Sequence, residues 1–375
     1  MANTFKFGNG NWAVKDGSAL AYNDENNNFK PLPFDFTRAS SATTLNRQGL
    51  IETVGSGKPR IDFLNNTKGH LLLEPSRSNL ATYSEGFSNW SIISSGVVVT
   101  DNTTDVLSPS GKNDASKVEF NAASKILGQS PTLSGNYSGF VYVKGTQGET
   151  IRFNFGGTEE NFTLTGGWDK LERTNITATA NAFNLNTYGG ATARTIYVYG
   201  AQLESGSYPT SYIPTEGSSV TRVVETTNAT VPSGVFGTSE GTIYAEGVVA
   251  VEEGVGQMPF TAGTDAANLI YVWIQANGRL MAESYTSSLQ CNISSSIGIL
   301  SVGDSYKIAF GYANNDFVLY LNGTQIGTDT NGSIAVPSNV KVGGYIASGY
   351  EGGKIKQTKI YDTRLTNTEL QNLTT

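Results

Sequence analysis

Few side chains in this sequence could carry catalytic chemistry. His70 is the only histidine, so a histidine-based metal site or serine triad would depend on that one ring. Its position beside an apolar leucine triplet favours a structural role. Cys291 is the only cysteine and has no companion motif, which favours an inert core residue over a nucleophile. A single cysteine also excludes an intrachain disulfide.

Acidic residues are plentiful, and two carboxyl groups about 5–10 Å apart in a cleft can hydrolyse a glycoside. The adjacent pairs Glu159-Glu160 and Glu252-Glu253 would point to opposite faces of a strand. The acidic runs at residues 23–28 and 329–333 could supply oxygen ligands to calcium, but they lack EF-hand spacing and also suit turns. We therefore predict a protein that is not an enzyme and needs no cofactor. Structural calcium and a glycan depolymerase are the open alternatives.

Aromatic side chains are the remaining candidates for binding. The chain has 18 tyrosines and 4 tryptophans, enough for a platform on which the apolar face of a sugar could stack. Tyr285, Tyr345 and Tyr350 lie close to glycines and serines in expected loops. Trp273 alternates with Tyr271 in an apolar run that also suits a core strand. We predict glycan binding through Tyr285, Tyr345, Tyr350 and Trp273, with ordinary surface or core aromatics as the alternative.

The elements that would position these residues are predicted to be strands. Gly accounts for 43 residues, and charged residues for only 15% of the chain against roughly 25% in an average globular protein. A surface of Ser, Thr, Asn and Gly suits short strands and tight turns, because Gly and Asn accept positive φ and Thr packs well on a pleated face. The length of 375 residues predicts more than one domain.

Alternation of period two supports this prediction. In the segment NYSGFVYVKG, Tyr137, Val141 and Val143 fall on one face and Phe140 on the other, as in a strand. Further along, Ile308 and similar residues alternate in YKIAFGYANNDFVLYLNG, where two strands flank an Asn-Asn-Asp turn. We therefore expect antiparallel sandwiches rather than helical domains.

Local signals are sharpest near the C-terminus. Asn322-Gly323 is the strongest short hairpin signal, because both central positions of a type I′ turn need positive φ. Thr366 and Glu369 fit a capping box, which predicts one short helix at the end of the chain.

Charge and hydropathy limit the partners. The net charge of −7, without a basic cluster, argues against nucleic acid. No run approaches the roughly 18 apolar residues of a membrane-spanning helix, and the N-terminal residues do not resemble a signal peptide. We expect neither nucleic-acid binding nor membrane insertion.

The pattern changes along the chain and predicts three regions. Residues 1–80 have short apolar islands among Asn, Pro and Gly, too few for a separate core, so we expect an extended arm that packs on something else. Residues 81–222 and 223–375 alternate regularly and predict two antiparallel β-sandwiches of jelly-roll type.

Two long segments are similar to a known family. Residues 36–63, FTRASSATTLNRQGLIETVGSGKPRIDF, and 69–90, GHLLLEPSRSNLATYSEGFSNW, resemble a module of bacteriophage virion proteins of the tail-fibre, tail-tip and head-fibre type. The matching positions are Arg38, Ala39, Ser40, Gly49, Pro59, Arg60, Leu71, Leu72, Leu73, Glu74, Arg77, Asn79, Leu80, Tyr83, Ser84, Glu85, Phe87 and Trp90. Downstream, residues 81–222 resemble a carbohydrate-binding-module-like jelly roll, and residues 223–375 a laminin-G/concanavalin-like jelly roll.

The resemblance implies a role in the virion. The protein would be made in the host bacterial cytoplasm, dock onto other virion proteins through residues 1–80 and form a homo-oligomer. A trimer is common in such fibres, although no coiled-coil heptad run enforces it here. The expected function is non-enzymatic attachment to glycans of the host surface or of mucus. A purely structural connector or capsid decoration protein is the first alternative and a glycan depolymerase the second.

The same segments imply a structural junction. Leu71–Leu73 would form a short buried strand, and Glu74, Arg77 and Asn79 would fix the passage from the arm into the first jelly roll. A buried Glu–Arg ion pair there is one hypothesis, and two solvated side chains are the other.

Overall fold

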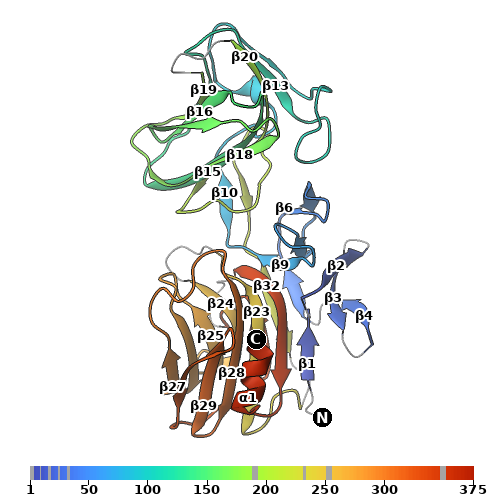
Figure 1. Cartoon of the computed structure of the whole chain (residues 1–375), viewed down its shortest axis with the longest axis vertical. Helices are drawn as coiled ribbons and strands as arrows, with labels where there is room; N and C mark the ends of the chain where they lie inside the picture. The colour runs from blue at the N-terminus through green and yellow to red at the C-terminus, as the bar shows by residue number, and fades with distance from the viewer. Residues whose placement is uncertain are drawn as a thin grey trace.

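The computed structural model describes residues 4–375 except 9, 16–17, 24–25, 32–33, 188–192, 231–233, 251–255 and 347–351. The described chain forms two antiparallel β-sandwiches that follow each other along the long axis, with the short helix α1 (Asn367–Thr374) at the C-terminus (Figure 1). The all-β prediction is confirmed. No helix in the described part of the chain is long and apolar enough to cross a membrane.

The first sandwich consists of two facing sheets, named here by a central strand. The β16 sheet has the order β11 (Ile92–Ile93), β14 (Ile126–Gln129), β19 (Phe183–Asn186), β16 (Thr150–Phe155) and β17 (Thr158–Thr163). The β15 sheet has the order β12 (Val97–Thr100), β13 (Ser116–Phe120), β20 (Arg194–Ser205), β15 (Asn136–Lys144) and β18 (Trp168–Thr177). A 3₁₀ turn, η1 (Phe87–Asn89), leads into them.

The core of this sandwich follows the alternation read from the sequence. Val141 and Val143 lie between the sheets with Trp90, whereas Phe140 packs on the outer face of the β15 sheet against Tyr212. The prediction that these strand residues divide between two faces is therefore confirmed.

The second sandwich also has two sheets. The β23 sheet has the order β30 (Thr324–Asp329), β29 (Asp316–Leu321), β28 (Ser305–Ala313), β23 (Glu240–Val248), β32 (Gly353–Tyr361), β9 (His70–Leu73) and β8 (Arg60–Asp62), and β1 (Thr4–Phe7) also pairs with β32. The β25 sheet has the order β27 (Leu289–Ser294), β26 (Leu280–Thr286), β25 (Asn268–Ile274), β24 (Gln257–Asp265), β31 (Asn339–Val342), β22 (Thr226–Thr230) and β5 (Asp35–Thr37).

The C-terminal signals are found where the sequence placed them. Asn322 and Gly323 join β29 to β30 with φ of 47° and 79°, the positive values that a type I′ turn requires. Thr366 caps α1: its side chain accepts a bond from the Glu369 N–H, and its own N–H donates to the Glu369 carboxylate at 2.8 Å. Leu370 then packs on the β23 sheet.

The described parts of residues 1–80 are extended, as expected, but much of this stretch is built into the second sandwich. β1 and β9 both pair with β32, β8 pairs with β9, and β5 pairs with β22. Leu71 and Leu73 lie in the core of that sandwich, because β9 is paired with β32 on one side and β8 on the other and so gains backbone hydrogen bonds as well as apolar burial. The role of this stretch in docking to a virion stays a prediction.

The remaining strands form three small sheets outside the two sandwiches. β2 (Trp12–Lys15), β3 (Ser18–Asn23) and β4 (Asn28–Pro31) form a small sheet, and β6 (Ala42–Leu45) and β7 (Ile51–Val54) form a hairpin. β10 (Arg77–Asn79) and β21 (Val220–Arg222) pair antiparallel between the two sandwiches, so the chain enters and leaves the first sandwich by adjacent strands (Figure 1). The first sandwich is thus inserted into the chain of the second.

Candidate functional site

Two of the predicted tyrosines meet a third on the outer face of the β25 sheet. Ile270 and Val272 point into the core, so Tyr271 between them faces away from it. The Tyr271 and Tyr285 rings stack with centroids 6.2 Å apart and an interplanar angle of 13°. The Tyr345 ring meets Tyr271 edge-on at 5.9 Å. The strand pairing therefore turns residues far apart in the sequence into one aromatic cluster.

A buried carboxylate joins this cluster. Glu283 lies directly across from Tyr271 in the β25–β26 pair and is 6% exposed. It accepts hydrogen bonds from the hydroxyls of Tyr271 and Tyr285 (3.1 Å for Tyr285) and from the side-chain amide of Asn292 (3.1 Å). Burial, and then the Glu283 charge, raise the pKa of Tyr271 and of Tyr285, which keeps both phenols protonated as donors.

Neighbouring residues extend this surface. Trp273 follows Tyr271 on the same face of β25 and is half-buried opposite Met281. Thr261 donates a hydrogen bond to the carbonyl of Gly344 at 2.7 Å, which fixes the backbone just before Tyr345. We call the following set the tyrosine face: Tyr271, Trp273, Glu283, Tyr285, Asn292 and Tyr345.

The structure places most of the predicted glycan residues together and adds others. Tyr285, Tyr345 and Trp273 belong to the tyrosine face, whereas Tyr350 lies outside the described residues, as does the pair Glu252-Glu253. Sequence reasoning missed Glu283 and Asn292. The registers of the β25–β26 and β26–β27 pairs would have been needed to place them, because alternation within one strand does not say which residue lies opposite Tyr271 or Glu283.

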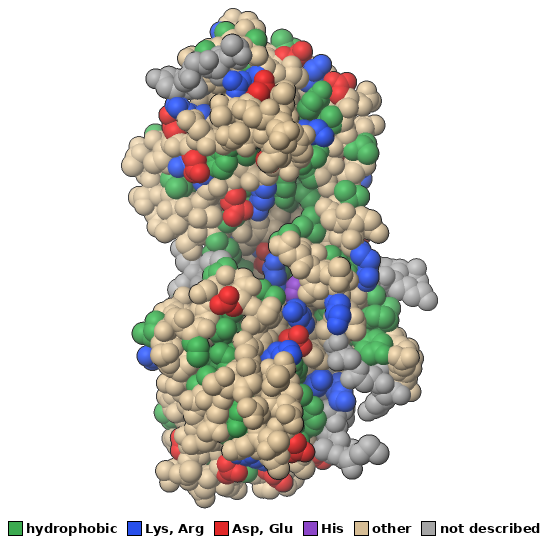
Figure 2. All heavy atoms as spheres, viewed as in Figure 1, with side chains coloured by type: hydrophobic (Ala, Val, Ile, Leu, Met, Phe, Trp, Pro, Cys, Tyr) green, Lys and Arg blue, Asp and Glu red, His purple; other side chains and the backbone are tan. Residues whose placement is uncertain are grey.

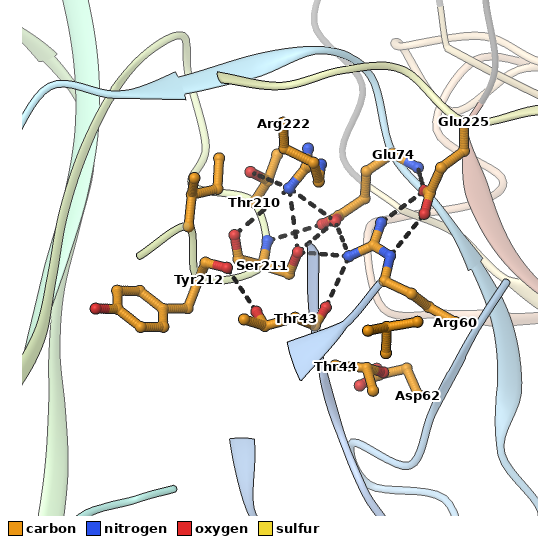
Figure 3. Close-up of polar contacts among 12 residues, drawn as sticks. Thr43, Thr44, Arg60, Asp62, Glu74, Thr210, Ser211, Tyr212, Arg222 and Glu225 are labelled. Atoms are coloured by element: carbon orange, nitrogen blue, oxygen red, sulfur yellow. Dashed lines mark hydrogen bonds and ion pairs between the residues drawn. The ribbon is translucent and has the colours of Figure 1, made fainter. Parts of the chain in front are cut away.

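A second polar cluster lies at the junction between the sandwiches (Figure 3). Glu74 accepts hydrogen bonds from the backbone N–H and hydroxyl of Ser211 at 2.8 and 2.6 Å. Its carboxylate also pairs with Arg60 at 2.8 Å and Arg222 at 3.1 Å. Burial by itself would raise the pKa of Glu74, but the two guanidinium groups and the Ser211 donors outweigh it and hold that pKa well below its usual range.

Glu225 is the other acidic centre of this junction. Its carboxylate pairs with Arg38 at 2.8 Å and with Arg60 at 2.6 Å, and the side chains of all three residues are fully buried. The backbone N–H of Glu74 donates to Glu225 at 2.8 Å. We call Arg38, Arg60, Glu74, Arg222 and Glu225 the junction cluster. Its members come from the N-terminal stretch and from the two segments that flank the first sandwich.

Asn79 fixes the entry to the first sandwich. It is fully buried, and its amide donates to the carbonyls of Ala201 and Ile213 at 2.9 and 2.8 Å. Its side-chain oxygen accepts the N–H groups of Ala81 and Leu203, both at 3.0 Å. The side chain thus satisfies backbone groups on three separate segments, which suits a structural role.

Arg77 lies beside the junction cluster. Its guanidinium carbon is 5.4 Å from the centroid of the Tyr208 ring, a cation–π distance. The buried Glu–Arg contacts of Glu74 are those with Arg60 and Arg222. Spacing in the sequence suggested Arg77 as a partner because it is near in the chain, whereas the fold brings in arginines from farther away.

The lone histidine and cysteine are both buried. The Nε2 atom of His70 is 2.8 Å from the Asn66 amide, and burial, with Lys354 and Lys356 nearby, lowers the pKa of His70 to about 4. Cys291 lies in the core of the second sandwich, where burial raises the pKa of its thiol and keeps it protonated. Both positions suit structural residues.

The described acidic residues of these runs and pairs form ordinary contacts, whereas Asp24 and Glu25 of the run 23–28 lie outside the described residues. Glu159 pairs with Arg152 at 2.7 Å, and Glu160 pairs with Arg173 at 3.3 Å. Asp329 accepts a backbone N–H two residues ahead at 3.0 Å, the geometry of a turn. In the described parts of the chain, no group of three or more His, Cys, Asp or Glu side chains is placed to hold a metal ion. The expectation of no cofactor, with structural calcium as its alternative, stays untested.

Comparisons with known proteins give only distant likenesses. No protein-family model matches the chain, and no curated protein matches its sequence. The CBM40 of the Ruminococcus gnavus IT-sialidase is 20% identical over 37% of this chain and 84% of that one, with a TM-score of 0.32. Domain 4 of a GH43 extracellular arabinanase from Geobacillus stearothermophilus was solved in complex with arabinotriose. It is 16% identical over 46% of this chain and 84% of that one, with a TM-score of 0.33. Likenesses of this degree carry no argument about this chain.

Proposed function

We propose that this chain is a non-enzymatic protein of the bacteriophage virion surface that attaches to glycans of the host cell or of mucus through its tyrosine face. The observation that carries the glycan proposal is the stack of Tyr285 on Tyr271 beside the Glu283 carboxylate. This arrangement combines an aromatic surface with hydrogen-bonding groups that also bond to one another on the same face.

This combination matches the chemistry of a sugar. One face of a pyranose carries C–H groups that pack on an aromatic ring, while its edge carries hydroxyls that both donate and accept hydrogen bonds. Glu283 holds the tyrosine rings in place through their hydroxyls. Asn292 is exposed and Tyr285 and Trp273 are half-buried, so all three reach the solvent at the edge of the face. An apolar surface that carries a small number of polar groups is typical of small-ligand sites.

The virion part of the proposal rests on the sequence resemblance of residues 36–90. In a particle, several copies would act together, so weak contacts at single tyrosine faces would add up to strong attachment through high effective concentration. Docking through the N-terminal stretch and a homo-oligomeric state in the mature virion, such as a trimer, are part of this proposal. Neither a nucleic acid nor an inserted membrane segment enters it.

A glycan array and intact host cells, probed with the full chain, test the proposal. The full chain is required because a fragment of residues 223–375 would lack β5, β8 and β9, which belong to the two sheets of the second sandwich. We expect Tyr285→Ala to weaken binding about tenfold, the loss of one aromatic stacking contact worth roughly 1.4 kcal/mol. The matched control is Tyr197→Ala, an outward tyrosine of the first sandwich beside Asp105. Equal binding by wild type, Tyr285→Ala and Tyr197→Ala would overturn the tyrosine-face assignment.

A purely structural connector is the second candidate, and the junction cluster favours it. Buried ion pairs between three chain segments tie the N-terminal stretch to both sandwiches, as a force-transmitting connector would require. Absence of glycan binding by a folded full chain would favour this role. A depolymerase would turn over bound glycan, and release of reducing ends during the same binding experiment detects it.

A further inference from the structure

A cavity lies between the two sandwiches. It has a volume of about 550 Å³, within the roughly 300–1,000 Å³ of small-molecule sites. In the space-filling view the waist of the molecule is hollowed, and basic and acidic side chains lie there side by side (Figure 2). The cavity is separate from the tyrosine face: none of the residues of that face lines it.

The first sandwich supplies one wall. Lys170 and Glu172 form an ion pair on the outer face of β18, and the Lys170 ammonium lies 4.1 Å from the centroid of the Phe140 ring. Tyr142, on the neighbouring strand β15, also lines the cavity and is half-buried. This wall therefore offers an aromatic ring next to a paired anion and cation.

The second sandwich supplies the opposite wall with the same chemistry. Asp62 on β8 is 3.6 Å from the ammonium of Lys354 on β32, and its other carboxylate oxygen accepts the Leu45 N–H at 3.1 Å. Burial, and then the charges of Glu172 and Asp62, raise the pKa of Tyr142 to about 12. Both carboxylates, one from each wall, therefore act on the same tyrosine.

Charge balance decides which ligand fits. A ligand with net negative charge would meet Asp62 and Glu172, and one with net positive charge would meet Lys170 and Lys354. Glu74 also lines the cavity, but its charge is compensated by Arg60 and Arg222. An apolar ligand would remove water from two ion pairs without replacing its hydrogen bonds, which is costly. A neutral polyhydroxylated molecule can donate to each carboxylate and accept from each ammonium while its C–H face packs on Tyr142.

We propose that the cavity between the sandwiches is a second binding site, for a neutral oligosaccharide that contacts both walls at once. The site does not depend on the tyrosine face. Because its two ion pairs come from different sandwiches, a bound oligosaccharide bridges them and favours one relative orientation.

The test uses the full chain with the tyrosine face disabled by Tyr285→Ala and Tyr345→Ala, probed on an array of neutral and sialylated oligosaccharides. Into this background we introduce Lys170→Ala with Glu172→Ala. The matched control is Lys117→Ala with Glu119→Ala, an ion pair two residues apart on β13 of the same sheet. Thermal unfolding checks that each variant is folded.

The expected result is residual binding of neutral oligosaccharides by the background protein. The Lys170/Glu172 change should weaken it about tenfold and the Lys117/Glu119 change should leave it unaltered, as expected for loss of charge-assisted hydrogen bonds at one site only. No residual binding, residual binding confined to sialylated probes, or equal binding by both double variants would overturn the second site. Failure of the tyrosine face shows separately, as equal binding by the wild type and the background protein.

Discussion

The junction cluster and the tyrosine face both centre on buried glutamates, but the partners differ. Glu74 and Glu225 are neutralised by arginines from distant segments, with Arg60 between them. Glu283 is instead surrounded by the neutral donors Tyr271, Tyr285 and Asn292, most of them on adjacent strands. At the junction the carboxylates contact charged guanidinium groups, whereas on the tyrosine face the carboxylate contacts neutral hydroxyl and amide groups.

This difference distinguishes a cluster that fixes chain segments from a surface that could bind a ligand. In the junction cluster, Arg38, Arg60 and Arg222 pair with Glu74 and Glu225, so the charges compensate one another and the network fixes chain segments. On the tyrosine face the half-buried rings and the exposed Asn292 keep contact with solvent, where a ligand could replace water. Burial and partner type, rather than the presence of a glutamate, distinguish the two regions.

The strongest test of this comparison is Glu225→Gln. The substitution keeps the shape but removes the acidic partner of Arg38 and one of the two acidic partners of Arg60. Because this leaves an uncompensated buried charge, we expect a loss of about 3–5 kcal/mol in the free energy of unfolding. Urea unfolding measures it. The control Glu159→Gln, whose carboxylate is 45% exposed beside Arg152, should cost less than about 1 kcal/mol. Similar losses for the two variants would contradict the junction as the main electrostatic anchor.

A buried ionisable group outside both regions, His70 on β9 of the second sandwich, makes the stability depend on acid. Its pKa is lowered to about 4 in the folded protein, by burial first and then by Lys354 and Lys356, against about 6.5 when unfolded. Between these values the unfolded chain binds a proton that the folded chain does not, so stability is lost as the pH falls. We expect about 2 kcal/mol less stability at pH 5 than at pH 7. Urea unfolding at both values, repeated with His70→Gln, should show a clearly smaller difference in the variant; an unchanged difference refutes this assignment.

Glu283→Gln is the corresponding substitution on the tyrosine face. Glutamine retains a carbonyl that can accept from the tyrosine hydroxyls, and no buried cation is left unpaired among the contacts described for Glu283. We therefore expect a loss of about 1 kcal/mol, the difference between charge-assisted and neutral hydrogen bonds. If urea unfolding gave a loss as large as that of Glu225→Gln, the distinction between the two regions would be wrong.

Tyr285→Phe gives the smallest expected effect. It separates the contribution of ring stacking from that of the hydroxyl hydrogen bond. The ring and its stack on Tyr271 remain, while the hydroxyl that donates to Glu283 is lost. We expect stability within about 0.5 kcal/mol of the wild type and glycan binding only about threefold weaker, less than the effect of Tyr285→Ala. A titration on immobilised glycan compares the two variants, and a loss for Phe equal to that for Ala would show that stacking contributes nothing.

Several features of the fold could be predicted because their causes are local. The Asn322-Gly323 hairpin depends on the φ preferences of two residues, and the cap of α1 depends on Thr366 and Glu369. The alternation around Val141 likewise divides the strand between core and outer face. The pairing of β8 and β9 with the second sandwich could not be found in this way, because about 280 residues separate β9 from β32 and edge pairing carries no short-range signal.

The sequence by itself determined the all-β class, the two sandwiches, the terminal helix and the choice of aromatic residues worth testing. Only the tertiary structure decided that Glu74 and Glu225 share Arg60, that Tyr285 stacks on Tyr271 over Glu283, and that the cavity has a paired anion and cation on each wall. The physical reason is range. Turn, cap and alternation preferences act over a few residues, whereas ion pairs, ring stacks and cavities depend on which distant strands the packed core brings together.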